Sequence, residues 1–254
     1  VTTMVGMFTS YSSNPNVTSW DVSSVTNMQQ MFYEASAFNQ DLSSWDVSSI
    51  TNMQQMFRQA SALNQDLSSW DVSSVTNMVQ MFYQASAFNQ NLNSWNVSSV
   101  NNMQGLFQFA SAFNNDISSW DVSSVTNLQE IFTSATEFNN DISLLDISNS
   151  VALNNIFSYA SAFNQDISSW NTSNVKSMDG MLRSAVAFNQ DISLWDVSSV
   201  TSMSYLFQSA NASFDQAISA WDVSSVRTMR SMFESASSNP NVTSWDVSRV
   251  TDMY

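Results

Sequence analysis

Aspartate carboxylates are the side chains of this sequence best suited to chemistry, because the chain contains no histidine and no cysteine. Thiolate nucleophiles, imidazole bases, disulfides and the usual zinc sites are therefore excluded. The aspartates recur about every 25 residues in two columns. The first column contains Asp21, Asp46, Asp71, Asp121, Asp146, Asp196, Asp222 and Asp246. The second contains Asp41, Asp66, Asp116, Asp141, Asp166 and Asp191.

The first column suggests a cation-binding or ligand-binding ladder, because hard cations such as calcium take oxygen ligands. Stacked carboxylates repel one another, so a cation, serine hydroxyls such as those of Ser44 and Ser48, or backbone N–H groups must compensate the charge. The alternative is that each aspartate accepts local hydrogen bonds in a turn and was copied with its repeat, and we favour this structural alternative. No metal site is therefore assigned, and calcium is the one cofactor considered.

Catalysis is not expected of these carboxylates. A glycosidase needs two acids in unlike environments, one of them with a raised pKa. The aspartates of this chain lie in equivalent, repeated settings. We therefore predict that the protein is not an enzyme and has no catalytic residues.

The two columns belong to a tandem repeat that runs through all 254 residues. The consensus unit W-D-V-S-S-V-T-N-M-Q-Q-M-F-Y-Q-A-S-A-F-N-Q-D-L-S-S occurs about ten times without a linker. All nine tryptophans share one register, with Leu145 in the one vacant place: Trp20, Trp45, Trp70, Trp95, Trp120, Trp170, Trp195, Trp221 and Trp245. Because no unit can bury its apolar face alone, we expect residues 1–254 to form a single solenoid domain.

Two periodicities within a unit predict two elements. Apolar residues from Val25 to Ala35 recur at steps of three and four, which predicts a short α-helix or 3-10 turn. The pattern L-x-x-W-x-V at residues 42–47 predicts a short parallel strand with Trp45 and Val47 pointing inward. Strands stack more closely than helices, so the expected fold is a solenoid of short parallel strands and helical returns, a curved or gently twisted rod with the strands on its inner face.

An asparagine column at the bend of each unit is expected to be structural. A stacked amide can satisfy backbone groups that the bend leaves open. The column consists of Asn39, Asn64, Asn89, Asn114, Asn139, Asn164 and Asn189.

Residues 25–48 carry the string V-T-N-M-Q-Q-M-F-Y-E-A-S-A-F-N-Q-D-L-S-S-W-D-V-S. This string resembles the 26-residue repeat of bacterial surface proteins that are grouped with the BspA-like leucine-rich repeats. The resemblance covers essentially all ten units. It implies a leucine-rich-repeat-like solenoid displayed outside the cell, often in adhesion or surface layers, and it implies no enzymatic activity.

Charge and hydropathy exclude several partners. Six basic residues against 21 acids give a net charge of -15, the wrong sign for nucleic acid or anionic lipid. No apolar run is long enough to cross a membrane, so no membrane insertion is expected in this segment. The chain begins at Val1 without a signal-like segment, and we expect it to be a mature or excised portion of a protein.

Five N-x-[ST] motifs are candidate N-glycosylation sites. They place the acceptor at Asn16, Asn96, Asn171, Asn211 and Asn241. In a eukaryotic source these residues predict a glycoprotein, and in a bacterial source they are ordinary polar residues.

The two ends of the chain resemble each other. Both prolines, Pro15 and Pro240, lie in matching variants of the unit near the ends, and no cap is evident. Uncapped ends invite head-to-tail pairing with another copy. The alternative is an array whose caps lie outside the sequence, and both remain open.

The leading functional hypothesis is an extracellular or cell-surface structural or adhesive protein. It would act as a rigid repetitive rod with many weak contacts in series, and copies of it would stack into a filament. The alternative is a leucine-rich-repeat module that binds a peptide, glycan or surface on the inner strand face. That alternative predicts an irregular patch, and the best candidate is residues 144–153, where the tryptophan and the usual S-S-V-T are lost.

Overall fold

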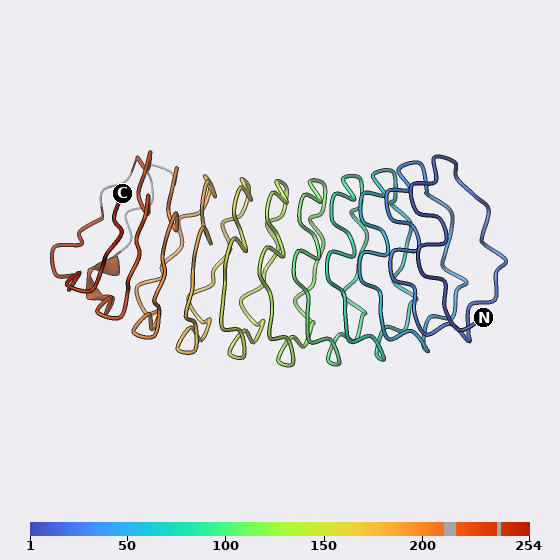
Figure 1. The fold of residues 1–254 in the computed structure, drawn as a ribbon, viewed down its shortest axis with the longest axis horizontal. Helices are drawn as coiled ribbons and strands as arrows, with labels where there is room; N and C mark the ends of the chain where they lie inside the picture. The colour runs from blue at the N-terminus through green and yellow to red at the C-terminus, as the bar shows by residue number, and fades with distance from the viewer. Residues whose placement is uncertain (211–216, 238–239) are drawn as a thin grey trace.

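The computed structural model describes residues 1–210, 217–237 and 240–254 (Figure 1). Over these residues the backbone forms coils of about 25 residues that are stacked along the long axis of the molecule (Figure 1). The described chain contains one 3-10 helix, η1 at Ile218–Ala220, and no α-helix. Its β-structure consists of isolated parallel bridges at Thr3↔Asn27, Asn27↔Asn52, Asn52↔Asn77, Asn77↔Asn102, Asn102↔Asn127, Ala152↔Ser177, Ser177↔Ser202, Ser202↔Thr228 and Thr228↔Asp252. The predicted leucine-rich-repeat solenoid of strands and helices is therefore wrong, because the fold is built mostly of irregular turns.

Left-handed residues explain why the predicted helix at residues 25–35 does not form. Gln30 and Glu34 both have a φ of 57°. The equivalent residues of the next repeat, Gln55 and Gln59, have φ values of 56° and 61°. A right-handed helix needs negative φ at every residue, so these two positions interrupt it in each repeat. The apolar spacing of three and four arises instead from a series of short turns.

Backbone hydrogen bonds in this segment alternate between two kinds of partner. The Met31 N–H donates to the Met28 carbonyl within the repeat (3.1 Å), whereas the Gln30 N–H donates to the Gln54 carbonyl of the next repeat (3.0 Å). Neighbouring residues repeat this alternation, and every N–H and C=O of residues 28–35 has a partner. The segment can therefore be packed between its neighbours without forming a helix or a continuous sheet. We call the face made by residues 26–34 and their equivalents the ladder face.

The predicted strand at residues 42–47 is also absent. The Trp45 N–H donates to the Leu42 carbonyl in a local turn (3.1 Å). Consecutive tryptophan segments are instead joined by side chains, as where the Trp70 indole Nε1–H donates to the Leu42 carbonyl (3.0 Å). Trp45 and Val47 are buried, as predicted. The apolar alternation thus identified the inward residues but not the backbone conformation.

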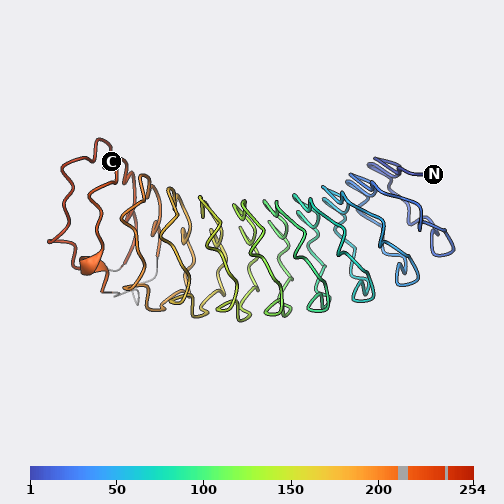
Figure 2. The ribbon, with the colours of Figure 1, turned by 90° about the horizontal axis from the view of Figure 1, so that it is seen from below.

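The stack is bowed, and the segment that begins at the N-terminus lies on the concave side (Figure 2). Spacing between equivalent rings increases away from the ladder face. Ring centroids are 5.6 Å apart for Phe32 and Phe57, but 6.5 Å apart for Trp95 and Trp120. Hydrogen-bonded backbones on the ladder face lie at about 4.8 Å. The ladder face is therefore the inner side of the curve, and the tryptophan segment, which was expected there, lies on the outer side.

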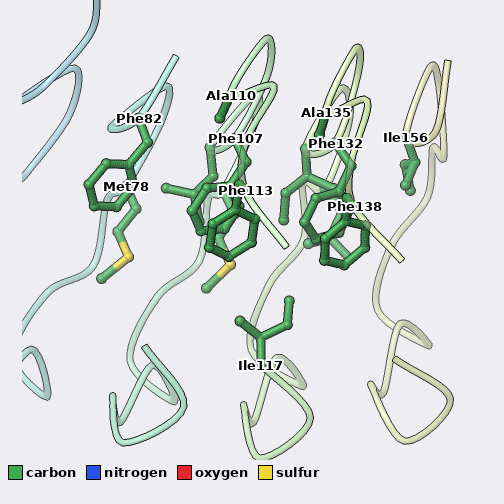
Figure 3. Packing of buried hydrophobic residues seen from close by; sticks show 14 of the residues in the cluster. Met78, Phe82, Phe107, Ala110, Phe113, Ile117, Phe132, Ala135, Phe138 and Ile156 are labelled. Atoms are coloured by element: carbon green, nitrogen blue, oxygen red, sulfur yellow. The ribbon is translucent and has the colours of Figure 1, made fainter. Parts of the chain in front are cut away.

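Columns of aromatic and aliphatic side chains fill the interior (Figure 3). The Phe107 ring stacks on Phe113 at 3.8 Å within its repeat and on Phe82 and Phe132 at 5.6 and 5.9 Å in the adjacent repeats. Leu145 is buried in the vacant place of the tryptophan column. The core therefore continues from repeat to repeat along the described chain.

The junction between residues 126–128 and 151–152 is expected to be the most labile part of the ladder. The described residues have no bridge between Asn127 and Ala152, and the Leu128 N–H lacks the partner that the equivalent Met103 N–H finds at Asn127 (3.0 Å). Amide exchange measured by NMR should be faster at Leu128 and Val151 than at Met103. Equal protection of Leu128 and Met103 would contradict a break in the ladder.

Candidate functional site

The first aspartate column lies in a series of turns closed by serine. The Ser48 N–H and hydroxyl both donate to Asp46 Oδ1, at 3.1 and 2.6 Å. The same N–H contact to the serine two residues later is made by Asp21, Asp46, Asp71, Asp121, Asp146, Asp196, Asp222 and Asp246. These bonds lower the pKa of each of these carboxyls, with the serine hydroxyl as the main cause. Each of these exposed aspartates therefore has a local structural role.

The second aspartate column forms an equivalent turn at the bend. The Ser43 N–H donates to Asp41 Oδ1 (2.9 Å), and the other five members of the column make the same contact. The backbone N–H is the main cause of the lowered pKa at Asp41, Asp66, Asp141, Asp166 and Asp191. Both columns thus use one carboxylate oxygen to close a turn.

The calcium ladder stays a prediction. The described residues contain no group of three or more acidic side chains placed to hold one metal ion. Repulsion from its neighbours Asp71 and Asp21 acts on the Asp46 carboxyl, but the serine bonds have the larger effect on its pKa. Calorimetric titration with millimolar calcium tests the ladder directly, because a bound cation would give a saturable heat change and raise the melting temperature.

Acid is expected to destabilise the fold through these turns. The carboxyls have lower pKa values in the folded chain than in the unfolded chain, where the pKa of aspartate is about 3.9. Their stabilisation is therefore fully present above that pH and is lost as the pH falls through the lower folded values. The melting temperature measured against pH should fall steeply below about pH 4.

Asparagine substitution provides the control for this acid sensitivity. Asn96 already replaces aspartate in the first column and accepts the same two bonds from Ser98, at 3.2 and 2.8 Å. Converting Asp71 and Asp121 to asparagine should keep the turns at neutral pH and make the acid decline shallower. An unchanged acid decline in this double variant would argue against the carboxyls as its cause.

Four of the five candidate glycosylation asparagines are exposed on the described surface: Asn16, Asn96, Asn171 and Asn241. Each accepts hydrogen bonds through Oδ1 from the Ser or Thr two residues later. Asn211 lies outside the described residues. Glycosylation of all five sites remains a prediction, and the mass of the intact protein before and after glycosidase treatment tests it.

The bend asparagines are structural, as predicted. Asn39 Oδ1 accepts the backbone N–H of Asn64 in the next repeat (2.9 Å), and it also accepts the side-chain N–H of Gln65 (3.0 Å). The same amide-to-backbone contact recurs from Asn14 to Asn189. These side chains connect the repeats at the bend, next to backbone bonds such as that from the Ala62 N–H to the Ser36 carbonyl (3.1 Å).

Residues 144–153, the patch predicted to mark a specific site, are accommodated within the stack. Leu145 is buried, and the Asn149 side chain donates to the Ser123 carbonyl of the preceding repeat (2.7 Å). Leu144 is 80% exposed, as Leu194 is at 85% two repeats later. These residues therefore pack as part of the described stack.

On the ladder face the side chains differ from one repeat to the next, which was not predicted from the sequence. Here Arg58 lies between two aromatic rings, with its guanidinium carbon 3.8 Å from the Tyr83 centroid and 5.7 Å from the Tyr33 centroid. The Arg58 Nη1–H also donates to Gln80 Oε1 (2.6 Å). On the Asp and Ser surface the same residue types recur in nearly every repeat, whereas successive repeats differ at residues 29, 30, 33 and 34.

An open groove of about 490 Å³ lies at the edge of this face. Its lining consists of Glu34, Gln59, Gln84 and Phe109 from one column, with Ser36, Ser61 and Ser86 beside them. Four successive repeats contribute to it. In the sequence, the groove is indicated only by the change from glutamine at position 84 to Phe109 at the equivalent position of the next repeat. This change points to a binding site only when the column is known to face outward.

A second hollow, of about 710 Å³, lies at the C-terminal end of the stack. Apolar side chains line most of it, including Phe233, Val242, Trp245, Val247 and Met253. Val247 is 37% exposed and Met253 is 60% exposed.

A family model described as "Mycoplasma protein of unknown function, DUF285" matches residues 2–120, 102–213 and 187–254. The three matched segments overlap and together span the chain, which confirms the tandem repeat. No curated protein matches the chain significantly. The described part of the structure contains no helix long and apolar enough to span a membrane.

Proposed function

The chain belongs to the DUF285 family of Mycoplasma proteins of unknown function, and from its repeat structure we propose that it is an extracellular structural or adhesive surface protein. In this proposal the chain acts as a stiff rod that presents one short polar unit many times. Adhesion by such a rod comes from many weak contacts made together. The leucine-rich-repeat form of the ligand-binding alternative is set aside, because the fold lacks the strands and helices on which it depended.

The observation that carries this proposal is the continuity of connections between repeats. Backbone bonds join the repeats on the ladder face, as from Gln30 to Gln54 (3.0 Å). Indole bonds such as that from Trp70 to Leu42 (3.0 Å) join them on the opposite side. Because most coils are tied to the next coil on both sides, bending there requires bonds to break on one side. The rod therefore holds its polar surface in a fixed geometry.

Surface display is tested by antibody labelling of intact and permeabilised cells of the source organism. We expect intact cells to be labelled as strongly as permeabilised cells. Beads that carry many copies should adhere to a target surface much more strongly than the single chain binds it. Labelling that appears only after permeabilisation would contradict an extracellular location, and equal binding by beads and single chains would contradict the multivalent mechanism.

Head-to-tail stacking of copies is the finer part of the proposal. In this arrangement the first repeat of a second copy covers the apolar hollow lined by Phe233, Trp245 and Val247. Burial of this apolar surface would stabilise the contact between the copies.

Sedimentation velocity over a range of concentrations tests this stacking. We expect the sedimentation coefficient to rise with concentration, and we expect Val247→Glu to prevent the rise by placing a charge in the hollow. Val186→Glu is the control, because Val186 is similarly exposed, at 45%, but does not line the hollow. A monomer at every concentration would contradict stacking and leave surface display to the labelling experiment.

A further inference from the structure

We propose that the groove lined by Glu34, Gln59, Gln84 and Phe109 binds a neutral oligosaccharide. Nothing in the function proposed above requires this site, and it can be tested on the purified chain. The groove volume of about 490 Å³ lies within the range of about 300–1,000 Å³ that is usual for small-ligand sites. Its position on the concave side allows a short chain of sugar units to extend across several repeats.

The chemistry of the lining suits sugar hydroxyls. Two carboxamides and three serine hydroxyls provide both hydrogen-bond donors and acceptors, and one carboxylate provides further acceptors. The Glu34 carboxylate is held by the Ser10 hydroxyl, which donates to its Oε2 at 2.8 Å. No lysine or arginine lines the groove. A neutral ligand with many hydroxyl groups is therefore favoured over an anionic one.

Phe109 provides an apolar platform at one end of the groove. Its ring is 37% exposed, and the Tyr83 ring holds it edge to face, with centroids 5.4 Å apart and planes at 70°. The adjacent Arg58 guanidinium packs on Tyr83 in turn. An exposed ring that is already fixed in place can receive the apolar C–H face of a sugar ring with little loss of side-chain entropy.

Unused hydrogen-bonding groups face the same space. The Gln59 Nε2–H donates to Gln84 Oε1 (2.7 Å), which begins an amide ladder between repeats. The ladder stops there because the next residue of the column is Phe109 and the preceding one is Glu34. Gln59 Oε1 and Gln84 Nε2 consequently have no hydrogen-bond partner among the described residues. One acceptor and one donor thus remain for a ligand hydroxyl.

An extended peptide fits the groove less well. Peptides bind to repeat edges mainly through free backbone groups. On the neighbouring ladder face the backbone N–H and C=O groups of residues 28–35 are all paired. The groove also lacks the deep apolar pockets that would receive peptide side chains.

Isothermal titration of the purified chain tests the proposal with cellotriose, maltotriose and N,N′,N″-triacetylchitotriose as neutral probes and sialyllactose as the anionic comparison. We expect at least one neutral trisaccharide to bind with a Kd in the millimolar range or tighter, and sialyllactose to bind more weakly than that probe. Phe109→Ala should weaken binding of the neutral probe by about tenfold. Gln84→Ala should also weaken it, by removing the free donor.

Tyr159→Ala is the matched control, because Tyr159 occupies the same column, is 44% exposed and lies outside the groove. This variant should bind the neutral probe as tightly as the parent chain. Circular dichroism melting checks that each variant is folded. The proposal is overturned if no neutral trisaccharide binds, if sialyllactose binds best, or if Phe109→Ala and Tyr159→Ala have equal effects. None of these results bears on surface labelling or on stacking.

Discussion

Phe107→Ala is expected to lower the free energy of unfolding by about 3–5 kcal/mol, the usual cost of truncating a buried phenylalanine. Phe107 has no solvent-exposed area and stacks on Phe113 within its repeat at 3.8 Å. It also stacks on Phe82 and Phe132 of the adjacent repeats, at 5.6 and 5.9 Å. Removing the ring leaves a cavity that loosens contacts between three repeats. Urea denaturation followed by tryptophan fluorescence measures the change.

Phe109→Ala is the control for this loss, because it removes the same ring two residues away. The Phe109 ring is 37% exposed and contacts Tyr83 edge to face. Its removal should cost about 1 kcal/mol or less. Similar losses at Phe107 and Phe109 would mean that the stacked column does not hold the repeats together.

Ser184→Pro is expected to lower the free energy of unfolding strongly, whereas Ser184→Gly is expected to leave it unchanged or to raise it slightly. Ser184 has a φ of 54°, and its N–H donates to the Gln208 carbonyl of the next repeat (2.8 Å). Proline cannot adopt this φ and has no N–H, so it should cost about 3 kcal/mol or more. Glycine adopts the left-handed conformation without strain, so it should leave stability unchanged or raise it by up to about 1 kcal/mol.

The glycine substitution distinguishes the observed turns from the predicted helix. In a helix interior, glycine is destabilising by about 1 kcal/mol relative to alanine. Ser199→Gly serves as the control, because Ser199 has no positive φ and should lose about 0.5–1 kcal/mol. Chemical denaturation of the two glycine variants measures both changes. An equal loss at Ser184 and Ser199 would rule out the left-handed conformation at Ser184.

Repetition and burial could be predicted because they depend on residue types at a fixed period. Trp45, Val47 and Phe32 are buried, and the Asn39 amide pairs with the next repeat, as the sequence indicated. The aspartate turns also follow from local chemistry, since Asp46 accepts from Ser48 only two residues away. Short-range patterns of this kind do not depend on the path of the rest of the chain.

Backbone conformation could not be predicted by the same means. A spacing of three and four is shared by a helix and by the turns observed at Met28, Met31 and Phe32. The two left-handed positions are occupied by Gln30 and Glu34 in one repeat and by other non-glycine residues in most repeats. The chain has only three glycines, so glycine does not reveal these positions in the sequence. Nothing local identifies these residues as left-handed, because the bonds that hold them run to Gln54 and Arg58 in the next repeat.

The candidate groove was missed for a related reason. Phe109 stands out from its column only when that column is known to face outward. The predicted helix and strand placed the tryptophan segment and its aspartates on the inner side of the curve, and they placed the column of Phe109 on the outer side. The increase in ring spacing from 5.6 Å at Phe32 and Phe57 to 6.5 Å at Trp95 and Trp120 reverses that assignment.

The sequence by itself determined a 25-residue tandem repeat, the columns that are buried, the local turns at aspartate, and an acidic chain without histidine or cysteine. Only the tertiary structure decided that the ladder forms at residues 26–34, that it curves inward, and that Glu34, Gln59, Gln84 and Phe109 share one groove. The physical reason is that a 25-residue coil cannot form all of its backbone hydrogen bonds within itself. Half of its hydrogen bonds on the ladder face go to a neighbouring coil, so its conformation is fixed by contacts 24 residues away in the sequence.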